Sequence, residues 1–97
     1  MFLKIHRSRE YGDIVAVCDR ELLNTTIREG ALTVTITETF YGNTPATGEE
    51  VRHALKTAGT ANLMGERSVD VAIRMGLVAR TDCRMIGSVP HAQIYRL

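Results

Sequence analysis

The chain has 97 residues, 44% of them hydrophobic and 24% charged, with a formal net charge of +1. This is the composition and length of an ordinary globular domain, so we expect a single domain over residues 1–97 and neither a disordered tail nor a coiled coil. The near-neutral charge provides no strong overall field for nucleic acid or anionic lipid, so any basic patch must be local.

The sequence also indicates where the protein works. Its apolar runs are only a few residues long and its N-terminus lacks the layout of a signal peptide, so we expect no membrane partner. Cys18 and Cys83 lie far apart and form no CxxC motif, which is not the pattern of a secreted disulfide scaffold. We interpret both as reduced thiols and predict a cytoplasmic protein.

The first half of the chain predicts a hairpin, a helix and a further strand. Residues 2–7 alternate in polarity and residues 14–18 are continuously apolar, which favours two antiparallel strands joined by a polar loop. Asp19 is a good N-cap for a short helix that ends at Gly30. In residues 31–40 apolar side chains alternate with threonines, which is typical of a strand with one buried face.

The second half predicts two helices followed by two extended segments. Thr47 and Glu50 have capping-box spacing and open a helix to about residue 58. Residues 61–75 carry an apolar stripe at helical period, which predicts a longer helix. A short extended piece around Met85 precedes a last strand from about His91 to Leu97. The order β-β-α-β-α-α-β-β predicts an α+β fold, a two-layer, mostly antiparallel sheet with helices on one face.

Several segments together resemble a known protein family. The segments FLKIH, VAVCDRELL, REGALTVTITETFYGN, ANLMGERSVDVAIRMGLV and GSVPHAQIYRL occur in this order over nearly the whole chain. They are similar to the archaeal domain-of-unknown-function 424 family, and ANLMGER and VPHAQI are the most specific of them. The resemblance implies a small archaeal cytoplasmic protein. The family is uncharacterised, so it implies no catalytic residues.

The main candidate site is a polar surface on the predicted sheet. In the last strand, His91, Gln93 and Tyr95 alternate with apolar residues and therefore project from one face. We expect this strand to lie beside the first one, so that both contribute to one surface. The candidate binding residues are then Lys4, His6, His91, Gln93, Tyr95 and Arg96. A polar sheet face with an aromatic ring and cationic side chains is typical of an RNA platform. The structural alternative is an ordinary solvated sheet face.

A second candidate lies on the predicted long helix. Asn62, Glu66 and Arg67 are close in sequence, and Glu66 lies four residues before Asp70. Two carboxylates on one helix face have the composition of an acid/base pair, but a solvated face with internal ion pairs explains the same pattern. Cys18 precedes the expected helix start, where a thiolate would be stabilised, or it is simply a buried small residue. The cysteine and histidine spacings match no zinc motif, so we predict no metal and no cofactor.

Three functions are compatible with these features. The first is a small binding module for RNA or a ribonucleoprotein complex, based on the polar sheet face and on arginine supplying ten of the twelve basic residues. The second is an enzyme acting on a small polar metabolite, with His91 as general acid/base and Gln93 or Glu66 orienting the substrate. The third is a structural protein that forms a homo-oligomer, because Leu63 falls on a polar helix face and the last strand is expected at a sheet edge.

Overall fold

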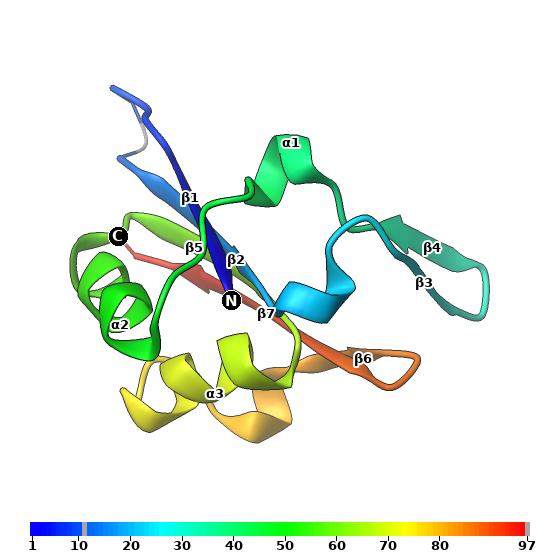
Figure 1. Ribbon diagram of the computed structural model, residues 1–97. Helices are drawn as coiled ribbons and strands as arrows, with labels where there is room; N and C mark the ends of the chain where they lie inside the picture. The colour runs from blue at the N-terminus through cyan, green and yellow to red at the C-terminus, as the bar shows by residue number, and fades with distance from the viewer. Residues whose placement is uncertain (11, 97) are drawn as a thin grey trace.

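A five-stranded sheet forms the centre of the computed structural model, which describes residues 1–10 and 12–96 (Figure 1). Its spatial order is β1-β2-β5-β7-β6. The pair β2–β5 is parallel and the other neighbouring pairs are antiparallel. The strands span Phe2–His6 (β1), Ile14–Cys18 (β2), Thr60–Met64 (β5), Arg84–Ile86 (β6) and Val89–Tyr95 (β7).

The two longer helices, α2 (Gly48–Thr57) and α3 (Glu66–Arg74), pack on one side of this sheet, which we call the helical face. The main core lies between them and the sheet, and it includes Val17, Leu55 and Val69. The short helix α1 (Glu38–Tyr41) contacts β1 and β2 on the opposite side. A separate hairpin of β3 (Thr26–Glu29) and β4 (Leu32–Thr35) contacts β6. A second core cluster fills the space on that side, and it includes Cys18, Ile36, Tyr41, Met64 and Ile86.

These elements confirm the predicted α+β fold with its mostly antiparallel sheet. The N-terminal hairpin forms as expected, with Phe2 opposite Cys18 and His6 opposite Ile14. The predicted capping box is present: Thr47 Oγ1 accepts the Glu50 N–H, and the Glu50 carboxylate accepts the Thr47 N–H. The backbone N–H of Thr47, and to a smaller extent its hydroxyl, stabilise the Glu50 carboxylate and lower its pKa. The last strand is β7, although the expected terminal residue Leu97 lies outside the described residues.

The helix predicted from Asp19 to Gly30 is wrong. A 3-10 turn at Arg20–Leu22 is followed by β3, and Gly30, at φ 59°, forms the hairpin turn into β4. Two causes are visible in the sequence and the contacts. The β-branched run from Thr25 to Ile27 favours a strand. The Asp19 side chain makes no cap for this turn, because its carboxylate binds a different segment.

The strand predicted over residues 31–40 is correct only at its start. β4 ends at Thr35, and the Thr37 side chain then accepts the Phe40 N–H as the N-cap of α1. The C-terminal part of the segment is therefore helical. A threonine followed by Glu38 is a helix-start signal that the threonine alternation of the preceding strand concealed.

The helix predicted over residues 61–75 is wrong in its first third. Thr60–Met64 is the central strand β5, Gly65 has φ 108°, and α3 begins at Glu66. β5 has only five residues, and the polar Thr60 and Asn62 alternate with buried Ala61 and Leu63 over too short a stretch to be distinguished from a helix turn by periodicity. Leu63 is 0% exposed in β5. It therefore lies in the core and on no polar helix face.

Candidate functional site

The polar side chains predicted in the last strand do project from one face of the sheet. Ala92 and Ile94 of β7 belong to the core under the helices, so the alternating His91, Gln93 and Tyr95 point to the opposite side. Tyr95 is 69% exposed, and its hydroxyl donates to Gln93 Oε1 over 2.9 Å. An exposed phenol ring and an amide are thereby held next to each other.

The neighbouring strand β5 extends this surface. Thr60 lies opposite Tyr95 and Asn62 lies opposite Gln93, and directly opposed residues direct their side chains to the same face. The Tyr41 hydroxyl donates to Asn62 Oδ1 over 2.6 Å. Burial raises the pKa of Tyr41, so the phenol stays a donor over the ordinary pH range. The bond orients the amide and leaves its NH₂ group as a donor for a ligand.

A basic side chain borders the surface on its other side. Arg84 of β6 is opposite His91 in register and is exposed. Burial, together with the Arg84 charge, lowers the pKa of His91 below its ordinary value. The half-buried imidazole is therefore neutral at pH 7. We call the six residues Thr60, Asn62, Arg84, His91, Gln93 and Tyr95 the β5–β7 surface.

The first strand does not lie beside the last one, contrary to the expectation from the sequence. β1 and β7 share the sheet but are separated by β2 and β5. Lys4 and His6 point to the same side as the β5–β7 surface, yet both hold α1 in place. Lys4 Nζ donates to the Thr39 carbonyl over 3.0 Å, and the His6 ring lies 2.7 Å from the Phe40 carbonyl oxygen and stacks on the Phe40 ring.

Arg96 also has a different position from the one expected. Its guanidinium donates to the Lys56 carbonyl over 2.7 Å and to the Ala58 carbonyl over 3.4 Å. These are carbonyls at the end of α2, which a cation stabilises. Arg96 therefore ties the end of β7 to a helix on the helical face and contributes no side chain to the β5–β7 surface.

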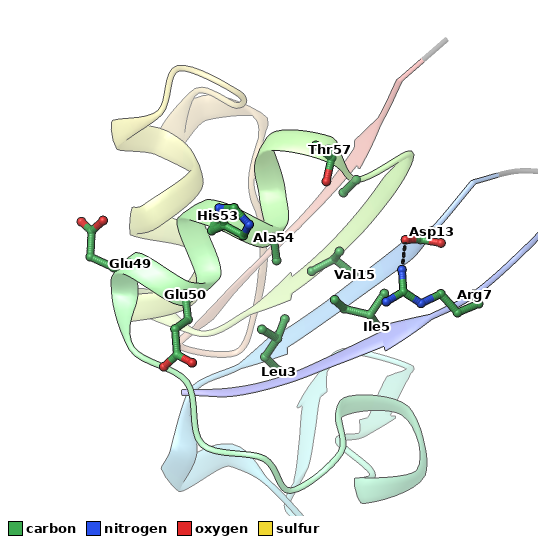
Figure 2. Close-up of a pocket in the computed structure, with 11 residues that line it drawn as sticks. Leu3, Ile5, Arg7, Asp13, Val15, Glu49, Glu50, His53, Ala54 and Thr57 are labelled. Atoms are coloured by element: carbon green, nitrogen blue, oxygen red, sulfur yellow. Dashed lines mark hydrogen bonds and ion pairs between the residues drawn. The ribbon is translucent and has the colours of Figure 1, made fainter.

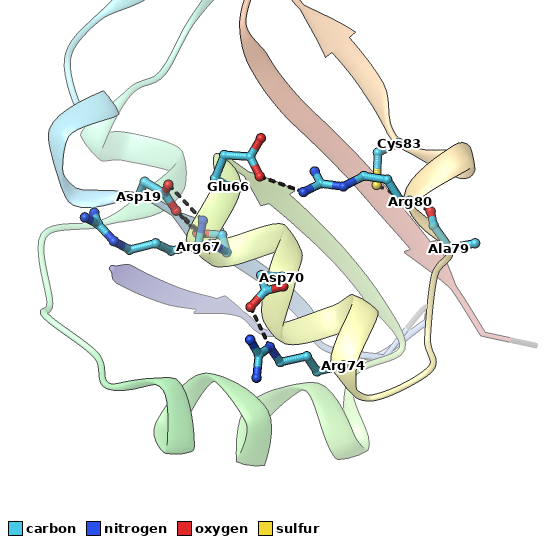
Figure 3. A network of polar contacts seen from close by, with 9 residues as sticks. Asp19, Glu66, Arg67, Asp70, Arg74, Ala79, Arg80 and Cys83 are labelled. Atoms are coloured by element: carbon cyan, nitrogen blue, oxygen red, sulfur yellow. Dashed lines mark hydrogen bonds and ion pairs between the residues drawn. The ribbon is translucent and has the colours of Figure 1, made fainter.

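The second predicted cluster, Asn62, Glu66 and Arg67, is not assembled. Asn62 belongs to β5 and binds Tyr41. Glu66 and Arg67 begin α3, where Glu66 pairs with Arg80 (Figure 3). Arg67 pairs with Glu21. These pairs are exposed, as expected for the alternative interpretation of a solvated helix face with ion pairs. Glu66 also lies on a helix that covers the other face of the sheet from His91, so the two do not form a catalytic pair.

A side chain from a distant segment occupies the start of α3. The Asp19 carboxylate accepts the Arg67 and Ser68 N–H groups and the Ser68 hydroxyl, at 2.8–3.0 Å. A Cβ at Gly65 would lie 2.4 Å from Asp19 Cγ, so only glycine fits there. The adjacent Cys18 is 0% exposed, and burial, together with the Asp19 charge, raises the pKa of its thiol to about 11. This is the opposite of an activated nucleophile.

Sequence reasoning missed a groove on the helical face, between β1 and α2. Figure 2 shows the side chains of Leu3, Ile5 and Val15 directed from the sheet toward the helix. The groove has a volume of about 650 Å³, within the range of ligand sites. Its border includes Glu49, Glu50, His53 and the Arg7–Asp13 ion pair. The alternation of residues 2–7 predicts only that Leu3 and Ile5 share one face of the strand. The groove itself depends on where α2 lies across the sheet.

Among residues 1–10 and 12–96, no cluster of three or more histidine, cysteine or acidic side chains has the arrangement of a metal site. In the same part of the chain, none of the helices has the length and apolar character needed to cross a membrane.

Comparison with known proteins places the chain in a family. The model of the family described as protein of unknown function (DUF424) matches residues 6–97. The chain belongs to the DUF424 family. A solved structure similar to this DUF424 chain is the crystal structure of an uncharacterized conserved protein from Methanopyrus kandleri. It has 25% sequence identity and a TM-score of 0.79, over 99% of this chain and 93% of that one. Among curated proteins, none matches the chain.

Proposed function

We propose that the protein is a binding module for single-stranded RNA, alone or within a ribonucleoprotein complex, and that the β5–β7 surface is its binding site. The observation that carries the proposal is that the exposed Tyr95 ring, the exposed Gln93 amide, the half-buried Asn62 amide and the exposed Arg84 guanidinium lie on one face of three neighbouring strands. Single-stranded RNA is recognised by stacking on rings and by hydrogen bonds to base edges.

Each group on the surface suits a different part of a nucleotide. The Tyr95 ring provides a stacking platform that tolerates any base. The Asn62 amide, fixed through Tyr41, supplies N–H donors to a base carbonyl, and Gln93 supplies both donors and acceptors. Arg84 at the border is positioned for a phosphate or for stacking on a second base. The helix that packs on β7, α3, lies on the helical face. Gln93 and Tyr95 are exposed on the opposite face, which suits an extended strand of several nucleotides.

The small net charge sets the expected strength of binding. With few cations available, the affinity falls in the range of non-specific nucleic-acid binders, with a Kd of about 10⁻⁴–10⁻⁶ M. Binding is measured by fluorescence anisotropy with labelled single-stranded uridine, adenosine and cytidine oligomers over a salt series. The proposal is contradicted if none of the three oligomers forms a complex at millimolar protein and 50 mM salt, where charges are screened over roughly 14 Å.

Matched substitutions locate the site. Tyr95→Ala is expected to weaken binding by about 5- to 140-fold, because a base–aromatic stack is worth about 1–3 kcal/mol. Tyr95→Phe keeps the ring and loses only the hydroxyl bond to Gln93, so it is expected to weaken binding much less than Tyr95→Ala. Arg84→Ala is expected to reduce the slope of log Kd against log salt by about 1, whereas Arg52→Ala, on the exposed side of α2, leaves it unchanged.

We further propose a cytoplasmic location and an archaeal origin. Cys18 and Cys83 are both free thiols, which suits a reducing compartment. The similar structure comes from Methanopyrus kandleri. One sequence argument for self-association is lost, because Leu63 is buried. The other holds in part, because β6 pairs only with Val89, Pro90 and His91, and the rest of β7 has no outer strand among the described residues.

A further inference from the structure

The second surface of interest is the outer edge of β1, which is only partly covered. The Leu3 N–H donates to the Thr44 carbonyl over 3.1 Å, and the Met1 carbonyl accepts the Ala46 N–H over 2.8 Å. An extended segment of the chain itself, residues 44–46, therefore already pairs with the N-terminal half of this edge, through a bridge between Phe2 and Pro45.

The other half of the edge has its backbone groups directed outward. In an antiparallel ladder, a residue directs both its N–H and its C=O to the same side, and the direction alternates along the strand. Because the Leu3 N–H points away from β2, the N–H and C=O of Ile5 also point away from it. Within residues 1–10 and 12–96, these two groups of Ile5 have no backbone partner. The Ile5 side chain is 37% exposed and directed into the groove below α2 (Figure 2).

The charged side chains around the groove favour a ligand that carries a positive charge. The lining contains the carboxylates of Asp13, Glu49 and Glu50 against the guanidinium of Arg7. Arg7 is paired with Asp13, which leaves the charges of Glu49 and Glu50 unbalanced. Glu50 accepts the Thr47 N–H, whereas Glu49 makes no ion pair or hydrogen bond with the described residues. The groove is thus apolar along β1 and negative beside the start of α2.

We propose that this groove binds an extended peptide that adds a strand to the free half of β1, inserts an apolar side chain over Leu3 and Ile5, and places a lysine or arginine beside Glu49. Residues 44–46 show that the edge accepts a strand in this way. The added strand would continue along the edge from the point where that segment leaves it. Strand addition gives affinity through main-chain bonds and specificity through alternate side chains.

The test uses two synthetic heptapeptides. In the first, lysine, isoleucine, isoleucine and lysine alternate with threonines, so that the peptide fits in either direction; in the second, glutamates replace the lysines. Amide chemical shifts of the full chain are followed during titration. The expected result is a shift at Leu3, Ile5 and Ala54 with the lysine peptide, at a Kd below about 1 mM, and at least roughly tenfold weaker binding of the glutamate peptide.

Two variants at one position separate strand addition from pocket binding. Ile5→Ala and Ile5→Pro both remove the apolar side chain, but only proline removes the outward N–H, and edge strands tolerate proline with that N–H facing outward. If the peptide adds a strand, the Ile5→Pro variant should bind the lysine peptide roughly tenfold more weakly than the Ile5→Ala variant does. Glu49→Gln should weaken binding of the lysine peptide, whereas Glu38→Gln on α1 should leave its affinity unchanged.

The proposal is contradicted by any of three results. These are an absence of groove shifts at millimolar peptide, equal binding of the two peptides, and equal binding by Ile5→Pro and Ile5→Ala. Thermal unfolding of both Ile5 variants shows whether they fold. If Ile5→Pro is unfolded, the wild-type exchange rate of the Ile5 amide decides: protection on adding the lysine peptide supports strand addition, and unchanged exchange contradicts it.

Discussion

At the scale of single residues, the Asp19 carboxylate connects two segments that are far apart in the sequence. It leaves the end of β2 and binds the first turn of α3, 48 and 49 residues further on (Figure 3). It also accepts the buried Ser68 hydroxyl. One side chain therefore takes the place of an N-cap, since Gly65 at the N-cap position has none to offer.

Asp19→Ala is expected to destabilise the protein by about 2–4 kcal/mol, because the helix loses its cap and the Ser68 hydroxyl is left buried without a partner. Urea unfolding measures the difference in the free energy of unfolding. Glu21→Ala is the control, since its exposed pair with Arg67 is worth about 0–1 kcal/mol. Equal effects of the two substitutions would contradict the role given to Asp19.

His91 makes stability depend on pH. Its folded-state pKa is lowered by burial and by Arg84, so the unfolded chain binds the proton more readily. The contribution of the neutral ring is fully present above the unfolded pKa of about 6.5 and is lost as pH falls through the folded pKa. We expect the free energy of unfolding to fall more steeply below pH 6.5 in the wild type than in His91→Gln. A His91 ring that titrates above pH 6.5 by NMR would contradict this.

At the scale of elements, the sequence predicted those whose signals are local. The capping box that starts α2 lies within four residues, and the hairpin of β1 and β2 follows from two adjacent patterns. The strand β5 could not be recognised in this way. β5 is fixed by β2 on one side and β7 on the other, and both are remote in sequence. The helix α3 that follows it is capped by Asp19 and not by a neighbouring residue.

In the candidate site, too, only the residues with a local sequence signal could be predicted. His91, Gln93 and Tyr95 follow from alternation within β7. Lys4 and His6 could not be separated from them, because their use in holding α1 depends on Thr39 and Phe40, more than thirty residues away. Asn62 was singled out for the wrong element, and it joined the surface only when its segment proved to be a strand.

The hydrogen bond between Tyr41 and Asn62 connects the helix α1 to the β5–β7 surface. Tyr41→Phe is expected to cost about 1 kcal/mol and to weaken RNA binding, because the Asn62 amide loses its fixed orientation. Tyr95→Phe, which removes an exposed hydroxyl, is the matched control and should be nearly neutral. Urea unfolding and anisotropy report the two effects. Unchanged stability and RNA affinity in Tyr41→Phe would show that the bond has no such role.

At the scale of the whole molecule, the two proposed surfaces lie on opposite faces of one sheet. The helices α2 and α3 cover the centre of the helical face and leave the groove along β1. The helix α1 and the β3–β4 hairpin cover the ends of the other face and leave β5 and β7 accessible between them (Figure 1). This separation means that a peptide in the groove and an RNA on the β5–β7 surface do not compete for the same side chains.

The most direct test of the RNA-binding proposal is to map amide chemical shifts on the full chain during titration with a single-stranded uridine oligomer. The proposal predicts that the changing amides belong to β5, β6 and β7, with Asn62, Gln93 and Tyr95 among the largest shifts, and that Tyr95→Ala suppresses them. Shifts confined to β1 and α2, or an unchanged spectrum at saturating RNA, would contradict it.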